Sequence, residues 1–284
     1  MTEATPRMRM VVITGLSGSG KSVALKALED EGYCCIDNLP ASLIGAVIEH
    51  LLASGQTEVA LSIDARSANC LAELPAALAW LRPRLDLKVL FIDAKDDTLL
   101  RRFSETRRRH PLSGGGRSLT EALALERELL APLIGLAHHI DTSGLSANAL
   151  RAWVKSVCEL TQAGFTLVFQ SFGFKHGIPL DADLVFDVRC LPNPHYEADL
   201  RPLTGRDPEV AAFLKGRAEV GAMLEDIRAY VDKWLPAYIA DNRSYFTVAL
   251  GCTGGQHRSV YFAEQLAAAF AGRLPVLVRH RELT

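Results

Sequence analysis

The chain has 284 residues, of which 49% are hydrophobic and 23% are charged, and its formal net charge is −2. This balance is typical of a globular protein with one large or two ordinary domains, and it excludes a strongly basic molecule drawn as a whole to nucleic acid or anionic membranes. The N-terminus lacks the apolar stretch of a secretory signal, and no apolar window is long enough for a membrane span. Six cysteines without Cys-x-x-Cys pairs fit free thiols, so we expect a cytoplasmic protein.

Short apolar runs alternate with helical patterns through the first half of the chain. The runs are continuous instead of alternating with polar residues, which indicates strands buried on both faces, as in a parallel sheet covered by helices. We therefore predict an α/β domain of the P-loop NTPase or kinase type. The predicted strands are 8–15, 33–37, 58–65 and 87–94, and the predicted helices between them are 22–32, 41–55 and 71–85.

The segment 98–112, TLLRRFSETRRRHPL, is predicted to be helical and is strongly basic. Its arginines, crowded within nine positions, are Arg101, Arg102, Arg107, Arg108 and Arg109. Arginines on a mobile lid close over transferring phosphates in small-molecule P-loop kinases, and the glycines at 114–116 suit a hinge. A solvated basic surface, or one that contacts RNA phosphates, accounts for the same charges, so both interpretations stay open.

The first half continues to residue 160, and a second domain follows it. The region 114–140 predicts a long helix, and 140–157 predicts a short strand and a last helix with Ser146 as its N-cap. A new apolar strand, TLVFQSFG, then restarts the pattern. We place the boundary before it, which gives domains of residues 1–160 and 161–284. Within the second domain, 217–238 predicts an amphipathic packing helix to which we assign no chemistry.

The segment GLSGSGKS matches the phosphate-binding pattern G-x-x-x-x-G-K-[ST] and lies between a predicted strand and a predicted helix. Such a loop wraps its backbone N–H groups around phosphates, and the helix adds the positive end of its dipole. We expect Lys21 to contact the β- and γ-phosphates and Ser22 to hold Mg²⁺. The predicted ATP-binding residues are Gly15, Leu16, Ser17, Gly18, Ser19, Gly20, Lys21 and Ser22.

A P-loop also needs an acidic residue at a neighbouring strand end to orient Mg²⁺ or its water. Asp64 and Asp93 both end predicted strands. Asp64 is preferred, because its strand follows the second helix as in small P-loop kinases, and Arg66 lies two residues further on. Asp93 has an alternative role as a cap of the segment after it. The predicted catalytic residues are Lys21, Ser22 and Asp64.

A second loop of anion-binding type, GCTGGQHRSV, lies near the end of the chain between an apolar run and a helical segment. Its Cys252 and Arg258 have the Cys-x₅-Arg spacing with which phosphotyrosine-type phosphatases hold phosphate. The sequence identifies no acid to protonate a leaving group, so we predict phosphate binding without cleavage in this α/β domain. The alternative is a buried thiol at Cys252 beside a simple glycine turn.

Three other segments of this half carry polar side chains in loops. SFGFKHGIP contains His176, DVRCLPNPH contains His195, and NRSY contains Arg243 and Ser244. Loops at the carboxyl ends of parallel strands are where α/β proteins bind ligands. We therefore expect these loops to converge on the second anion loop.

The chain resembles the RapZ/YvcJ family of nucleotide-binding proteins over essentially its whole length. The resemblance rests on motifs that occur in order: GLSGSGKS, SIDARS, RRFSETRRRHPL, SFGFKHGIP, DVRCLPNPH, NRSY and GCTGGQHRSV. It implies an N-terminal P-loop domain with modest ATPase and GTPase activity. It also associates Asp64, Ala65, Arg66 and Ser67 with GTP binding.

The same resemblance implies that the C-terminal domain senses glucosamine-6-phosphate. Enteric members of the family are RNase adaptors that bind small regulatory RNAs. Those members end in a lysine- and arginine-rich tail, whereas this chain ends in LVRHRELT. The residues implied for the sugar-phosphate pocket are His195, Ser244, Cys252, Thr253, Gly254, Gly255 and Arg258.

These observations predict a cytoplasmic regulatory protein of two domains. We expect it to bind and slowly hydrolyse ATP or GTP with Mg²⁺, to sense a phosphorylated amino sugar and to form a symmetric homo-oligomer. Two alternatives stay open. One is a small-molecule P-loop kinase, and the other is an RNA-binding RNase adaptor whose P-loop acts as a switch.

Overall fold

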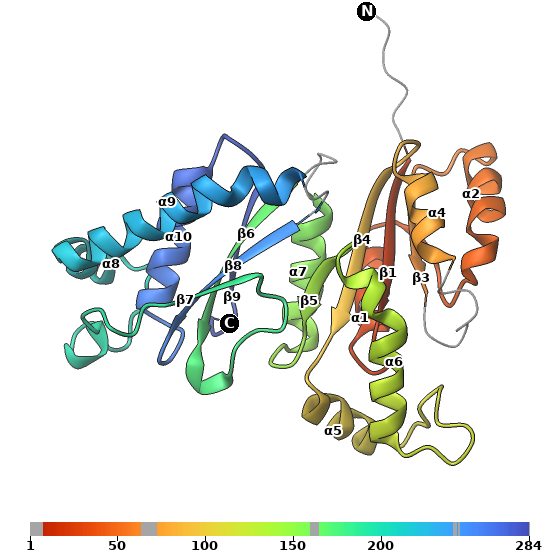
Figure 1. Cartoon of the computed structure of the whole chain (residues 1–284), viewed down its shortest axis with the longest axis horizontal. Coiled ribbons are helices and arrows are strands. Elements are labelled where there is room, and N and C mark those ends of the chain that lie inside the picture. The colour runs from red at the N-terminus through yellow and green to blue at the C-terminus, as the bar shows by residue number, and fades with distance from the viewer. Residues whose placement is uncertain (1–7, 64–72, 160–164, 241–242, 244, 284) are drawn as a thin grey trace, which may run out of the picture. The chain divides into compact units, whose positions relative to one another are not determined.

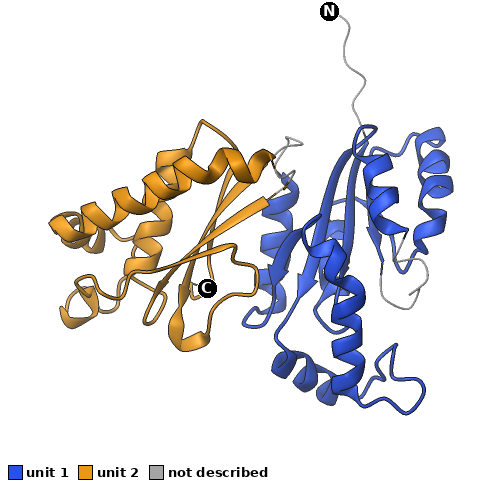
Figure 2. Ribbon diagram, viewed as in Figure 1, with its two compact units in different colours: residues 1–163 blue, residues 164–284 orange. Residues whose placement is uncertain are grey.

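The computed structural model describes residues 8–63, 73–159, 165–240, 243 and 245–283. The chain forms two compact units, Met1–Ala163 and Gly164–Thr284, each with its own sheet (Figure 2). The predicted GTP-binding residues Asp64, Ala65, Arg66 and Ser67, together with Ser244 of the predicted sugar-phosphate pocket, lie outside the described residues.

The first unit contains a parallel sheet in the order β2-β3-β1-β4-β5 (Figure 1). The central strand β1 is buried along its length after its first residue. Strands buried in this way are what the continuous apolar runs predict, and the α/β class is confirmed. The strands are β1 (Arg9–Gly15), β2 (Cys34–Ile36), β3 (Glu58–Ser62), β4 (Asp86–Asp93) and β5 (His138–Asp141).

Helices cover both faces of this sheet. Met10 and Val12 of β1 belong to an apolar cluster with residues of α2, α4 and α6. Val11 and Ile13 point to the opposite face, because side chains alternate along a strand, and there α1 contacts β1 and packs against α7. The helices are α1 (Lys21–Asp30), α2 (Ile44–Ala53), α4 (Leu74–Leu81), α5 (Asp96–Thr106), α6 (Leu119–Ile134) and α7 (Ala147–Glu159), and η1 (Ala41–Leu43) is a 3₁₀ turn.

The basic helix predicted over 98–112 is shorter than expected. It corresponds to α5, which ends at Thr106, and Arg107 then adopts a left-handed conformation with a φ of 51°. Pro111 also disfavours helical geometry at the residue before it. As a result residues 107–109, which we call the arginine segment, lie in the loop after α5 and not on a helix face.

A serine caps the first turn of both α6 and α7. Ser118 begins α6 with a capping box, in which its hydroxyl accepts from the Glu121 N–H and the Glu121 carboxylate accepts from the Ser118 N–H. Ser146 accepts a hydrogen bond of 3.2 Å from the Ala149 N–H at the start of α7. The predicted N-cap at Ser146 is therefore confirmed.

The second unit is also α/β, with a parallel sheet in the order β7-β8-β6-β9. One face of β6 and β8 packs on the helices, with Phe169 and Val248 in one apolar cluster with Ile227 and Phe262. No pattern described above predicts α8 or β9. The elements are β6 (Thr166–Gly173), β7 (Leu184–Asp187), α8 (Pro208–Lys215), α9 (Ala218–Ala240), β8 (Tyr245–Cys252), α10 (Arg258–Phe270) and β9 (Val276–His280), with 3₁₀ turns η3 (Phe174–His176) and η4 (Pro194–Tyr196).

The carboxyl ends of the strands form two places where a ligand could bind, one in each unit. In the first unit β1 ends at Gly15 and leads into α1, and in the second unit β6 and β8 end side by side at Gly173 and Cys252. Carboxyl ends of parallel strands are the usual place for ligands in α/β proteins. None of the described helices has the length and hydropathy that a transmembrane span requires.

Candidate functional site

The P-loop lies between β1 and α1, as its sequence predicts. Gly15 has a φ of 128°, and a Cβ atom there would lie 2.6 Å from the backbone nitrogen of Ile92 on β4. Gly20 immediately precedes α1 with a φ of 115°. Residues with a Cβ atom rarely adopt such φ values, so glycine at both positions lets the loop turn sharply against the sheet.

Lys21 and two serines supply the polar groups of this loop. The Lys21 ammonium donates to the carbonyl oxygens of Gly15 at 2.7 Å and Leu16 at 3.0 Å. Ser22 is exposed at the start of α1. The hydroxyl of Ser19 is buried and has no hydrogen-bond partner among the described residues. A buried polar atom left unpaired is costly, so this hydroxyl is suited to a ligand oxygen.

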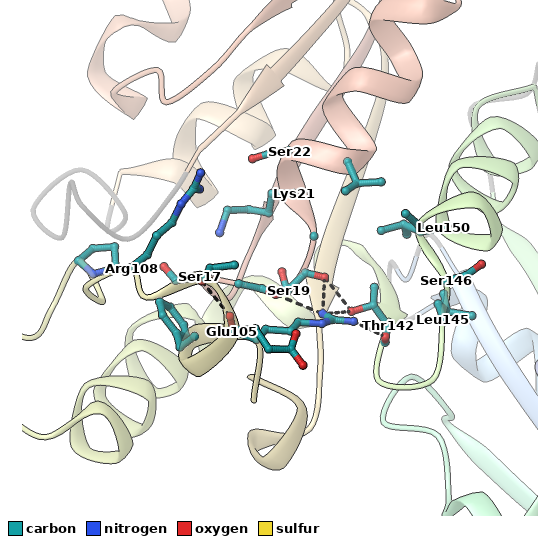
Figure 3. A pocket seen from close by; sticks show the side chains of 18 of the residues that line it. Ser17, Ser19, Lys21, Ser22, Glu105, Arg108, Thr142, Leu145, Ser146 and Leu150 are labelled. Carbon is teal, nitrogen blue, oxygen red and sulfur yellow. Dashed lines mark hydrogen bonds between the residues drawn. The ribbon is translucent and has the colours of Figure 1, made fainter. Parts of the chain in front are cut away.

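A cavity of about 510 Å³ opens beside the loop (Figure 3). Lys21, Ser22 and Arg108 lie toward one end of it, and Leu145 and Leu150 lie toward the other. This arrangement offers cations and N–H groups to phosphates and apolar side chains to a base. The lining residues are Ser17, Gly18, Ser19, Gly20, Lys21, Ser22, Val23, Arg102, Phe103, Glu105, Thr106, Arg108, Arg109, Pro111, Thr142, Leu145, Ser146, Ala147 and Leu150.

Three arginines of the predicted cluster line the cavity, and they fall into two groups. Arg102 on α5 is anchored, since it donates to the carbonyl oxygens of Gly18 at 3.1 Å and Ser19 at 3.2 Å and to both oxygens of Thr142. Arg108 and Arg109, in the arginine segment, are exposed and line the cavity. The first therefore supports the loop, and the other two face the space that a nucleotide needs.

Asp93 has its carboxylate engaged elsewhere. It is 3% exposed, and it accepts hydrogen bonds from Arg127 at 3.1 Å, His139 at 3.2 Å and the Ala94 N–H at 2.7 Å. A carboxylate held by this many donors is a structural ion pair and a cap of its own segment. The alternative role of Asp93 as a cap accordingly fits the structure.

The second anion loop joins β8 to α10 and folds around its own thiol. Cys252 is buried, and its sulfur accepts a hydrogen bond of 3.2 Å from the Gly255 N–H. The Ser259 hydroxyl lies 3.1 Å from the same sulfur. Thr253 is exposed at the mouth of the loop. The N-terminus of α10 follows this loop, and such a helix end suits a bound anion.

Arg258 presents one edge of its guanidinium to this loop. Nη1 donates to the carbonyl oxygens of Arg189 and Leu191, each at 2.8 Å, while Nη2 lies 3.4 Å from the Thr253 hydroxyl. Nε is buried and has no partner among the described residues. The Nε–Nη2 edge is the fork that grips two oxygens of a phosphate, and here it is only weakly engaged.

The predicted convergence holds for the loops of His176 and His195 but is wrong for Arg243, which precedes β8 at the end opposite the second anion loop and pairs with Asp183. His195 lies beside the loop, with its ring centroid 6.2 Å from that of His257. Burial lowers the pKa of His257, whose Nε2 lies 3.2 Å from the carbonyl oxygen of Leu200. His176 pairs instead with Glu282 at 3.3 Å. Both His195 and His176 are therefore exposed near this loop, but His176 is held by Glu282 and His195 lies with its ring beside that of His257.

Both halves of the chain match models of one protein family. Residues 8–161 match the RapZ-like N-terminal domain, and residues 165–284 match the RapZ C-terminal domain. The chain belongs to the RapZ family. The family resemblance noted in the sequence is thus confirmed.

Relatives of similar length support this membership. A protein from Thiobacillus denitrificans, named a nucleotide-binding protein, is 59% identical over 278 residues, covering 98% of this chain and 100% of its own. A nucleotide-binding protein from Herminiimonas arsenicoxydans is 58% identical over 286 residues, covering 97% and 100%. The solved structure of a shikimate kinase from Bacteroides thetaiotaomicron is similar with a TM-score of 0.39 and 15% identity, covering 54% of this chain and 99% of its own.

Several residues at these sites carry no motif of their own. The local pattern predicts Arg102 only as a member of the basic cluster. It assigns to the P-loop neither Thr142, nor Glu126, which accepts hydrogen bonds from Ser17, nor His110, which lies 3.0 Å from Glu126. Ser259 is the second residue of α10 and directly follows Arg258, so the Cys252-x₅-Arg258 motif could have pointed to its hydroxyl. The others reach the loop only through tertiary contacts.

Proposed function

We propose that this protein binds a nucleoside triphosphate with Mg²⁺ in the cavity beside the P-loop and hydrolyses it slowly. The observation that carries the proposal is that Ser17 to Ser22 of the P-loop line a cavity of about 510 Å³ at the N-terminus of α1. The names of the RapZ-family relatives, which are called nucleotide-binding proteins, support it.

The charges around the cavity suit a triphosphate. Lys21 is held by carbonyl oxygens of its own loop and can turn to the β- and γ-phosphates with little loss, because a charged phosphate oxygen is a stronger acceptor than a carbonyl. Arg108 and Arg109 add positive charge from the side of the arginine segment. These groups stabilise the charge that develops on the transferring phosphoryl group.

Mg²⁺ fits the donor set at the same place. The exposed Ser22 hydroxyl at the start of α1 offers one oxygen ligand, and this ion takes its remaining ligands from phosphate oxygens and water. Because the Asp93 carboxylate already accepts from Arg127 and His139, we propose that Asp64 is the acidic residue that orients Mg²⁺ or its water. Bound there, Mg²⁺ would neutralise phosphate charge and orient the terminal phosphoryl group.

We further propose that the second anion loop binds a phosphorylated amino sugar, glucosamine-6-phosphate, as a regulatory signal. The weakly engaged Nε–Nη2 edge of Arg258, the exposed Thr253 and the loop N–H groups suit the phosphate. His195 stands beside the loop and suits the sugar. The sugar itself is inferred from the RapZ family.

One experiment tests the central proposal and its rivals. The full-length protein is incubated with Mg²⁺ and ATP or GTP, and nucleoside diphosphate and free phosphate are both measured. Equal amounts of the two products support hydrolysis. Diphosphate formed in excess of free phosphate, when cell metabolites are added, indicates a kinase. Nucleotide binding by calorimetry without turnover favours an RNase adaptor whose P-loop acts as a switch, and the absence of nucleotide binding refutes the P-loop proposal.

A further inference from the structure

A buried carboxylate holds the P-loop from the side away from its ligand. Glu126 lies on α6, and its side chain is completely buried. The backbone N–H of Ser17 donates to its Oε2 at 2.9 Å, and the Ser17 hydroxyl donates to its Oε1 at 2.7 Å. His110 lies 3.0 Å from Oε2 through its Nε2. Three donors therefore converge on one carboxylate.

The hydrogen bonds of His110 define its role. The Leu112 N–H donates to Nδ1 at 3.1 Å, so Nδ1 carries no proton and Nε2–H donates to Glu126. Burial raises the pKa of Glu126, but the hydrogen bonds from His110 and Ser17 and the charge of Lys21 together lower it by more. The pKa therefore lies below its ordinary value. The pair is a neutral imidazole and an ionised carboxylate.

This carboxylate joins two segments that face the cavity. Ser17 belongs to the P-loop, and His110 directly follows the arginine segment, in which Arg108 and Arg109 line the same cavity. The ring of Phe103 packs between them, 5.3 Å from the His110 ring by centroids. The two segments are distant in sequence, and Glu126 gives them a common buried anchor.

We propose that Glu126 and His110 are positioning residues that hold the P-loop and the arginine segment in the geometry that binds and turns over a nucleotide. This inference rests on the proposed nucleotide site. Because the Ser17 N–H is committed to Glu126, the orientation of that peptide is set and the N–H groups that follow it stay directed to the phosphates. The charge of Glu126 opposes phosphate binding, but three donors and Lys21 offset it, so the ordering effect dominates.

The first test replaces Glu126 with an amide of the same size. Glu126→Gln removes the negative charge and one acceptor oxygen: the remaining oxygen accepts from the Ser17 N–H and His110 only in weaker neutral hydrogen bonds, and the NH₂ group faces the Ser17 hydroxyl in place of an acceptor. The affinity of the full-length protein for Mg²⁺ and AMP-PNP should therefore fall about tenfold by calorimetry. Glu128→Gln is the matched control, because Glu128 is exposed on the same helix, and its affinity should equal that of the parent. Unchanged or tighter binding in Glu126→Gln would overturn the inference.

The second test separates positioning from stability. His110→Ala keeps the bonds between Ser17 and Glu126 but releases the arginine segment, so turnover should fall about tenfold while AMP-PNP affinity changes by less than about threefold. His110→Gln restores a donor to Glu126 and should recover most of the turnover. Equal turnover in these two variants, or a lower melting temperature as the sole effect of His110→Ala, contradicts the positioning role.

The outcomes also separate this inference from the proposed function. A parent protein that does not bind AMP-PNP refutes both, whereas a parent that binds it beside an equally competent Glu126→Gln variant refutes the positioning role alone. If Glu126→Gln does not fold, Ser17→Ala removes only one donor and should weaken binding about threefold. Full affinity in Ser17→Ala would then count against the inference.

Discussion

The two glycine-bearing loops of this protein occupy equivalent places in their sheets but supply charge in different ways. Each follows a buried parallel strand and leads into a helix. The P-loop keeps its cation, Lys21, on carbonyl oxygens of the loop itself, beside a cavity. The second loop wraps the Cys252 thiol, and its cation, Arg258, is 3% exposed and anchored on the carbonyl oxygens of Arg189 and Leu191.

The difference shows how one supersecondary unit serves two classes of ligand. A flexible lysine on its own loop can follow a long triphosphate, since its ammonium is a point charge. A buried guanidinium held from another segment has a fixed fork and suits a single compact phosphate. The strand and helix provide the N–H groups in both units, and the anchoring of the cation sets what each loop can hold.

Removing the cation of the P-loop should give the largest effect. Lys21→Ala should lower nucleotide hydrolysis by about a hundredfold or more, because a charge aimed at the transferring phosphoryl group is lost. Phosphate release measures this, and the unfolding midpoint should stay near that of the parent. Lys26→Ala is the control, since Lys26 is exposed one turn further along α1. Turnover retained in Lys21→Ala would refute the assignment of this loop.

The same change in the second loop should weaken a different ligand. Arg258→Ala should reduce glucosamine-6-phosphate binding by about 1.5–3 kcal/mol, the worth of a charge-assisted hydrogen bond. Calorimetry with glucosamine-6-phosphate, glucosamine and inorganic phosphate measures it. Arg258→Lys keeps the positive charge but lacks the guanidinium fork, so its affinity for glucosamine-6-phosphate should lie between those of the parent and Arg258→Ala. Equal affinity in all three proteins would make the second loop a structural turn.

Two adjacent glycines of the second loop, Gly254 and Gly255, differ in how closely they are packed. Gly255 has a φ of 77°, and a Cβ atom there would lie 2.7 Å from the backbone nitrogen of Gly173, whereas nothing lies within 4 Å of a Cβ at Gly254. Gly255→Ala should lower the free energy of unfolding by about 1–3 kcal/mol. Gly254→Ala should leave it nearly unchanged. Denaturant titrations of the two variants that coincide would argue against this packing.

The smallest effect concerns acid. The pKa of Glu126 lies below its ordinary value of 4.5, so its ionised form stabilises the folded protein above pH 4.5, and this contribution disappears as pH falls through the lowered pKa. The parent should therefore lose stability more steeply than Glu126→Gln below pH 4.5, and the two should run parallel above it. Melting temperatures across this range measure the difference. Curves that stay parallel below pH 4.5 as well would show that the ionisation of Glu126 does not stabilise the folded protein.

The sequence by itself determined the α/β class and the position of both loops. The apolar runs are local and continuous, and a buried parallel strand tolerates little else, so β1, β4 and β8 could be read directly. GLSGSGKS and Cys252-x₅-Arg258 are contiguous, and their glycines and helix starts are local requirements. Even so, the helix predicted through the arginine segment was wrong, because the left-handed turn at Arg107 ends α5 early.

Only the tertiary structure decided how these loops are held. Glu126 meets Ser17 across 109 positions of sequence, and Arg258 meets the carbonyl oxygen of Arg189 across 69. The spacing of Leu123, Leu130 and Leu133 places Glu126 on the buried face of α6 and leaves Glu128 on the exposed face, but a helical repeat does not record which loop the buried face meets. Such contacts depend on how separate elements pack together, and so they become visible only when the chain is folded.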